Sequence, residues 1–133
     1  MIGAIIGDVV GSRFEFDNYK SKDFEMFDKE CDFTDDSVMT LAIAKALQPY
    51  ETITDYDGFK KELVAVMHEV GMRYPHCGYG GRFCVWMMKN HTEPYNSYGN
   101  GSAMRVAPVG WFANSLEECE SLAATTAEGT HNH

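Results

Sequence analysis

The residues best suited to chemistry are two adjacent carboxylates, Asp35 and Asp36, in the stretch DFTDDSVMT. An apolar run rich in alanine follows them and stops at Pro49, so the pair falls on the first turn of a predicted helix. A side chain of Thr34 or of one aspartate would cap that turn, and acidic residues suit its positive end. One residue is enough to cap the turn, so capping leaves the second carboxylate without a role. Two adjacent carboxylates also repel each other, so the pair needs another explanation.

A hard divalent cation is the alternative reason for this crowding. The hydroxyl of Thr34 and the carboxylates of Asp35 and Asp36 offer several oxygen ligands within one helical turn, as Mg²⁺ or Ca²⁺ requires. Because Mg²⁺ keeps several of its waters, a few protein oxygens are enough. From these residues alone, capping and cation binding both remain open.

A second candidate is the stretch YGNGSAMR. Gly99 and Gly101 allow a ligand to approach the backbone closely, and Ser102 stands where a helix is expected to begin. Backbone N–H groups in such a place suit a phosphate, although the same letters also describe an ordinary turn with a cap. The pattern therefore favours neither reading by itself.

Further polar residues are scattered along the chain. His131 and His133 are two positions apart, so their side chains would converge only if the segment is extended. They are either a pair of metal ligands or part of an unstructured tail. Glu15 either faces solvent or approaches the aspartate pair across a loop. Asp8, within an apolar run, is expected to be hydrogen-bonded or to lie near the site, because burial without a partner is costly.

The elements that must position these residues read as helices. The expected helices cover 2–10, 37–48, 59–71, 82–90, 103–115 and 116–129, with a disturbance at Pro108 and a long loop over 17–33. Gly3, Gly7 and Gly11 share one face of the first helix, which we expect to pack centrally; a buried strand is the alternative there. No convincing set of strands is found, so the sequence predicts an all-α fold.

Composition narrows the functional classes. The 133 residues suffice for one domain, and 44% of them are hydrophobic. The net charge of −9 argues against nucleic acid and against an anionic membrane as partners. The four cysteines lack C-x-x-C spacing, and the chain opens without a basic signal region, so we expect reduced thiols in a cytoplasmic protein.

Taken together, four stretches resemble the ADP-ribosylglycohydrolase family, and most closely its small bacterial members. They are GAIIGDVVGSRFEF, FTDDSVMTLAIAKAL, YGNGSAMRVAPVGW and THNH, in this order, from the first residues to the last. The resemblance implies an all-α orthogonal helical bundle around a binuclear Mg²⁺ centre, sometimes Mn²⁺. It also implies hydrolysis of the glycosidic bond that joins ADP-ribose to a protein side chain or a similar acceptor.

The resemblance assigns roles residue by residue. Thr34, Asp35 and Asp36 match metal ligands, with both aspartates also in catalytic positions. Glu15 matches an acidic catalytic residue that lies over the metals and governs substrate access. The ADP-ribose loop matches Gly99, Asn100, Gly101 and Ser102, and His131 matches a histidine that reaches toward the diphosphate and the distal ribose.

The sequence also departs from the family pattern. Family members are longer, and their C-terminal half carries a D-x-D-T/S element that completes the metal site. Only Asp55 and Asp57 form a D-x-D here, in a stretch that predicts a turn. Residues 1–133 therefore read as the N-terminal part of a single truncated domain, with uncovered helix faces that favour self-association. A non-catalytic ADP-ribose-binding remnant and a helical cation-binding module are the alternatives to an active hydrolase.

Overall fold

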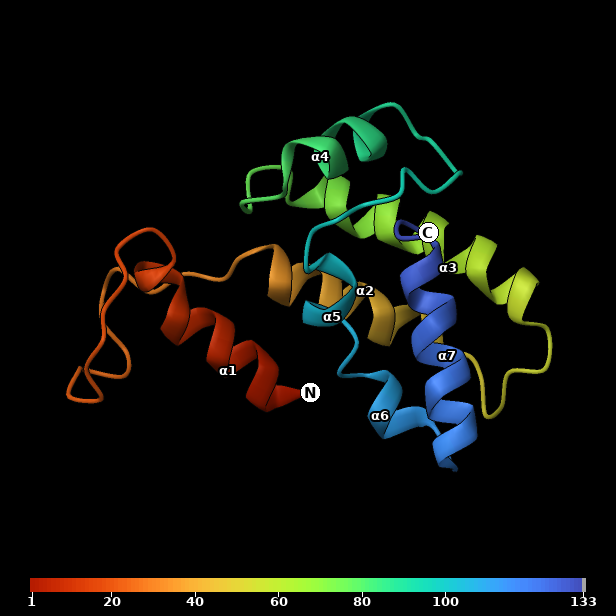
Figure 1. Cartoon of the computed structure of the whole chain (residues 1–133), viewed down its shortest axis with the longest axis horizontal. Helices are drawn as coiled ribbons and strands as arrows, with labels where there is room; N and C mark the ends of the chain where they lie inside the picture. Colours follow the sequence, from red (N-terminus) through yellow and green to blue (C-terminus); the bar gives the residue numbers. More distant parts are fainter. Residues whose placement is uncertain (133) are drawn as a thin grey trace.

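The computed structural model describes residues 1–132, and every regular element in that range is helical, which confirms the all-α prediction (Figure 1). The elements are α1 (Ile2–Gly11), the short 3-10 helix η1 (Ser12–Phe14), α2 (Asp35–Leu47), α3 (Tyr56–Arg73), α4 (Gly81–Met88), α5 (Gly101–Met104), α6 (Val109–Phe112) and α7 (Leu116–Glu128). Within residues 1–132, no helix has the length and apolar character needed to cross a bilayer.

The hydrophobic core lies around α2 and α3, with α4 and α7 packed against α3 (Figure 1). Met39 and Ile43 of α2, Leu63 and Met67 of α3, and Leu122 of α7 are fully buried there. Removing these side chains from water is the main source of stability for a domain of this size. The packing of α2 in the core leaves its first turn, which carries the aspartate pair, at the edge.

The first helix is observed as predicted, but the prediction that it packs centrally is wrong. None of the residues of α1 is buried, and Ile2 is 72% exposed. A Cβ added at Gly3, Gly7 or Gly11 would meet nothing within 4 Å, so the glycine face is open. The reason is that α1 packs mainly against α2 and η1, at one side of the molecule (Figure 1).

The helix predicted over 103–115, with its disturbance at Pro108, is observed as two short helices, α5 and α6. The chain forms α5 up to Met104, breaks, and starts α6 after Pro108, whose φ is −60°. Proline has no N–H and its ring clashes with the carbonyl four residues earlier, which belongs to Met104. The break buries Arg105, which is 1% exposed.

The start of α3 differs from its prediction as well. The helix begins at Tyr56 rather than near Phe59, and the Oδ1 atom of Asp55 accepts a hydrogen bond from the N–H of Gly58 at 2.9 Å. The D-x-D of Asp55 and Asp57 is therefore a helix cap and a first-turn residue.

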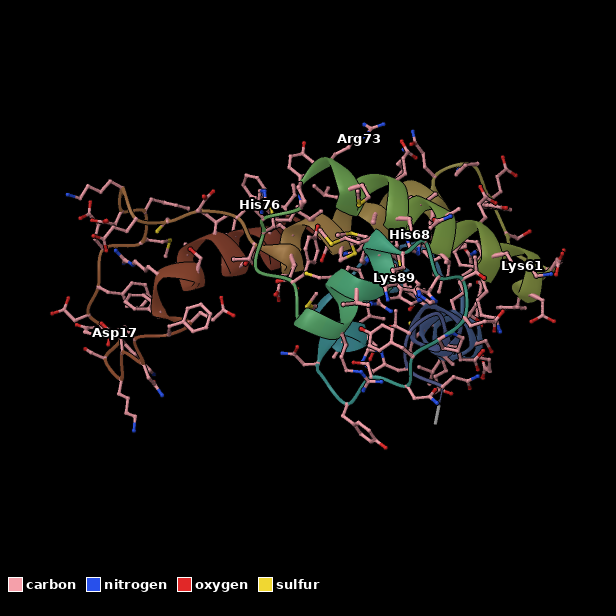
Figure 2. All side chains as sticks on the ribbon, turned by 90° about the horizontal axis from the view of Figure 1, so that it is seen from above. Asp17, Lys61, His68, Arg73, His76 and Lys89 are labelled. Carbon is pink, nitrogen blue, oxygen red and sulfur yellow. The ribbon has the colours of Figure 1, made fainter. Side chains whose placement is uncertain are left out.

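Two contacts position the chain that leads from α4 to the glycine loop. His68 of α3, labelled in Figure 2, lies with Nδ1 3.1 Å from the carbonyl oxygen of Met87 and Nε2 2.9 Å from that of His91. The Nε1–H of Trp86 donates to the carbonyl of Glu93 at 2.9 Å. These bonds fasten residues 87–93 to the helices and so fix where the following loop begins.

Gly71 offers a stability prediction for this core. A Cβ at Gly71 would lie 2.4 Å from Sδ of Met87, which is buried. We expect Gly71→Ala to lower the free energy of unfolding by about 1 kcal/mol, measured by urea denaturation, because overpacking outweighs the gain in helix propensity. Gly7→Ala is the matched control, since it places the same methyl in open space within α1 and should raise stability. Equal effects of the two substitutions would contradict this packing.

Candidate functional site

The first turn of α2 is held by a residue from another helix. The Oδ2 atom of Asp8, on α1, accepts hydrogen bonds from the N–H groups of Thr34 at 2.9 Å and Ser37 at 3.2 Å. The hydroxyl of Thr34 donates to Oδ1 of Asp8 at 2.6 Å and accepts from the N–H of Asp36 at 3.3 Å. Thr34 and Asp8 thus cap this helix, and capping does not account for Asp35 and Asp36.

The aspartate pair lies in a strongly negative environment. Burial, followed by the charge of Asp36 and those of Glu15 and Asp8, raises the pKa of Asp35 to about 6. Burial and the charges of Asp8 and Glu15 also raise the pKa of Asp36. No cationic side chain contributes to either shift. We call Asp8, Glu15, Asp35 and Asp36 the acidic group. Within residues 1–132, no cationic side chain offsets the charge of its aspartate pair.

Glu15 reaches this acidic group from the end of η1. It is exposed, and its charge acts on both aspartates. The loop that follows is irregular, as predicted, and lies to one side of the helices, where Asp17 is labelled in Figure 2. Stacking of Phe14 on Tyr19 at 5.2 Å between ring centroids fixes the base of this loop and hence the place of Glu15.

The turn between α3 and α4 closes the other side of the aspartate pair. The N–H of Asp35 donates to the carbonyl of Cys77 at 2.7 Å. Gly78 has a φ of +90°, which side chains rarely adopt, and a Cβ there would lie 3.7 Å from Oδ1 of Asp35. Sequence reasoning did not single out this turn; its glycine-rich letters, CGYGG, were the available signal.

The glycine loop lies across a pocket from Asp35. The pocket has a volume of about 330 Å³, and its lining includes Asp35 together with Gly99, Asn100 and Gly101. Aromatic side chains, among them Tyr79 and Tyr95, complete the wall. The structure thus brings together residues of the two stretches that the sequence analysis selected, although more than sixty positions of chain separate Asp35 from Gly99.

The backbone of this loop has free donors. Within residues 1–132, the N–H groups of Asn100 and Gly101 donate no hydrogen bond. A Cβ at Gly101 would meet His131 Cε1 only at 3.7 Å, an ordinary contact, so no neighbouring atom requires glycine there. Ser102 does not cap α5, which begins at Gly101 with no side-chain cap. The loop therefore presents bare backbone to the pocket.

The remaining predicted residues lie around the pocket rather than in its lining. Thr34, Asp36 and Ser102 do not line it. His131 contacts the glycine loop from behind, with Nε2 2.9 Å from the carbonyl oxygen of Gly99 and Nδ1 2.7 Å from Oγ1 of Thr130. The other half of the histidine pair, His133, falls outside the described residues.

The fit of this acidic group to a divalent cation is partial. Thr34, Asp35 and Asp36 supply hard oxygen donors, and burial together with neighbouring carboxylates raises the pKa of both aspartates, so a cation beside them would be favourable. In the described part of the chain, however, no three side chains of the His, Cys, Asp or Glu type are grouped closely enough to hold an ion. The donors fit Mg²⁺, which is often bound by only one or two carboxylates, better than a cation that needs a full protein cage.

A larger groove lies elsewhere and carries no comparable chemistry. Its volume is about 720 Å³, and it runs between α1, α2 and α6, with Ile2, Leu47 and Trp111 among its lining residues. None of the lining side chains is charged. The smaller pocket, with its carboxylate and free N–H groups, is the better candidate site.

Two comparisons with known proteins bear on the site. The family model described as ADP-ribosylglycohydrolase matches residues 1–133. A curated relative, ADP-ribosylhydrolase ARH3 from Bos taurus, is 26% identical over an alignment of 165 positions, gaps included, that covers 98% of this chain and 43% of the relative. The chain thus spans less than half the length of the relative that it matches.

Proposed function

Because the chain belongs to the ADP-ribosylglycohydrolase family, we propose that it hydrolyses the glycosidic bond between ADP-ribose and a protein side chain or similar acceptor, with Mg²⁺. The main observation in support of this proposal is that Asp35 and the loop Gly99–Gly101 line the same pocket. A nucleotide sugar held by the loop would have its reactive end facing carboxylates.

The proposed metal ligands are Thr34, Asp35 and Asp36. A cation here would offset the burial and the repulsion that together raise the pKa of both aspartates. When bound, Mg²⁺ would supply Lewis-acid polarisation and orient substrate hydroxyls. Mn²⁺ has the same preference for oxygen ligands and is the alternative ion.

The residues of the chain itself would bind the substrate and move a proton. The N–H groups of Asn100 and Gly101 are available to the diphosphate, which a protein of charge −9 cannot attract by its overall field. A carboxylate oxygen of Asp35 or Asp36 would take the proton of the attacking water, whose oxygen bonds to the anomeric carbon. The acceptor leaves with the bond electrons and receives that proton back from the carboxyl group. Glu15, whose charge acts on both aspartates, would govern substrate access.

A second candidate is binding of ADP-ribose without turnover. The observation in its favour is that residues 1–132 contain no three acidic, histidine or cysteine side chains grouped to hold an ion. A cation-only helical module would instead give no binding of ADP-ribose at all.

Self-association through uncovered helix faces stays a prediction, for which sedimentation analysis of the chain is the direct measurement.

Metal removal tests the proposed reaction. The chain is incubated with an ADP-ribosylated peptide and Mg²⁺, and released ADP-ribose is measured by chromatography. We expect release that stops with EDTA and returns with added Mg²⁺, because the aspartates would lose the ion that orients the substrate. No release at high chain concentration, with ADP-ribose still binding in calorimetry, would support the non-catalytic candidate. Release that EDTA leaves unchanged would contradict the metal dependence.

A further inference from the structure

The largest fully buried side chain of the described fold is a cation, Arg105. It is 1% exposed, and no carboxylate in residues 1–132 forms an ion pair with it. Its Nε–H is buried without a hydrogen-bond partner in the same range. Burial lowers the pKa of Arg105 to about 10, so the guanidinium stays protonated at neutral pH. An unpaired buried charge is expensive, which calls for a role beyond filling space.

Arg105 lies directly behind the glycine loop. Its Nη1 atom lies 3.9 Å from where a Cβ of Gly101 would be. Its Nη2 donates to the carbonyl of Thr126 and to Oγ1 of Thr130, both at 2.8 Å. The carbonyl of Thr130 in turn accepts the N–H of Ser97 at 3.0 Å, so the segment after α7 is joined to the start of the loop.

The direction of the hydrogen bonds in this chain of contacts is set at both ends. A guanidinium can only donate, and the carbonyl of Gly99 can only accept. Nε2 of His131, at 2.9 Å from that carbonyl, must therefore carry a proton. In the neutral ring Nδ1 is then an acceptor. The hydroxyl of Thr130 accepts from Arg105 and donates to Nδ1 at 2.7 Å rather than to the carbonyl of Ala127, which is more distant at 3.5 Å.

We propose that Arg105 is a positioning residue for the proposed ADP-ribose site, acting through Thr130 and His131 to fix the peptide plane between Gly99 and Asn100. Because a trans peptide is planar, its C=O and the next N–H point in opposite directions. With the Gly99 carbonyl held by His131, the N–H of Asn100 is turned away from His131 and left available to a ligand. The inference rests on the proposed function only for the identity of that ligand.

The ligand-free chain gives the first test. Nitrogen-15 NMR of the His131 ring at pH 8 should show only the neutral Nε2–H tautomer in the wild type. Without Arg105 or Thr130 to hold its Nδ1 side, the ring should leave the Gly99 carbonyl, so Arg105→Met and Thr130→Val should each show a mixture of tautomers. Thr130→Val preserves side-chain shape, so it decides the matter if Arg105→Met does not fold. Thr125→Val is the matched control, because the Thr125 hydroxyl donates within α7 to Ser121 at 2.9 Å. An unchanged tautomer in folded Arg105→Met or Thr130→Val would overturn the proposal.

Binding gives a second readout that a merely structural role would not produce. We expect Thr130→Val and Arg105→Met to weaken ADP-ribose binding about tenfold, the usual size of an effect on outer-shell partners, and Arg105→Lys to weaken it less. Adenosine, which lacks the diphosphate, should bind all variants alike. Equal losses for ADP-ribose and adenosine would overturn the positioning role. If the wild type binds neither, the proposed function fails, and the tautomer measurement still decides the role of Arg105.

Discussion

Replacing Asp35 with asparagine is expected to lower the proposed ADP-ribosyl hydrolysis by about 100-fold while making the folded chain more stable at pH 7. The activity should fall because a proposed metal ligand is lost, and even outer-shell partners of metal ligands typically contribute 10–100-fold, so about 100-fold is the scale for a ligand itself. The stability should rise because the ionised carboxylate is partly buried and lies among like charges, from Asp36 and then Glu15. Peptide hydrolysis and urea denaturation of the same two samples measure both effects.

The pH dependence of this gain follows from the direction of the shift. The pKa of Asp35 is raised from 3.8 to about 6 on folding, so the folded chain binds the proton more tightly than the unfolded chain. Ionisation therefore destabilises the wild type. The advantage of Asp35→Asn is absent below about pH 4, grows as pH rises, and is complete above about pH 6. Because the side chain is only partly buried, we expect about 1 kcal/mol at most.

Glu117→Gln is the matched control for this prediction. Glu117 lies in the first turn of α7, as Asp35 does in α2, and it is exposed. The substitution removes a first-turn carboxylate far from the pocket, so hydrolysis should be unchanged and stability slightly lower. If Asp35→Asn instead lowers stability and activity together, the carboxylate is structural and the proposed site is wrong.

Replacing Asp8 with alanine is expected to cause the largest loss of stability, about 3 kcal/mol. The substitution removes the acceptor of three hydrogen bonds from Thr34 and Ser37, and bonds to a charged group are the strong ones. It also frees α1 from the start of α2. Reduced repulsion on Asp35 and Asp36 offsets part of the loss. The free energy of unfolding, from urea titration at pH 7, is the measurement.

Asp17→Ala provides the comparison for Asp8→Ala. Asp17 is an exposed aspartate on the loop after η1, and its removal should change the free energy of unfolding by less than about 0.5 kcal/mol. Similar values for the two variants would show that Asp8 does not tie α1 to α2.

The helices were predictable where the local signals were strong. The alanine-rich run before Pro49 and the capping threonine located α2, and the apolar period of α3 located most of that helix. The length of the break between α5 and α6 was underestimated. The sequence shows that Pro108 disturbs a helix, but it does not show where the helices on either side of the proline end and begin. The packing of α1 was mispredicted because its glycine face indicates a possible close contact and says nothing about whether a partner helix is present.

The site was harder to predict than the helices. Thr34, Asp35 and the glycine loop were selected from their residue types and from the family resemblance, and the shared pocket depends on how α2, α5 and the turn after α3 pack. Asp8 was noticed only as an acidic residue in an apolar run. Arg105 was missed, although an arginine amid the apolar letters AMRVAPV was its signal. Contacts between distant segments carry no periodicity, so single-sequence reasoning cannot assign them.

The central claim is that the aspartate pair and the glycine loop form a single site for ADP-ribose and Mg²⁺. Titration of the nitrogen-15-labelled chain with ADP-ribose in Mg²⁺, followed by amide chemical shifts, tests it most directly. We expect the amides of Asp35 and Asp36 and those of Asn100 and Gly101 to shift together with one dissociation constant, and we expect binding to weaken when Mg²⁺ is omitted. Shifts confined to one of the two segments, or absent from both at saturating ligand, would contradict it.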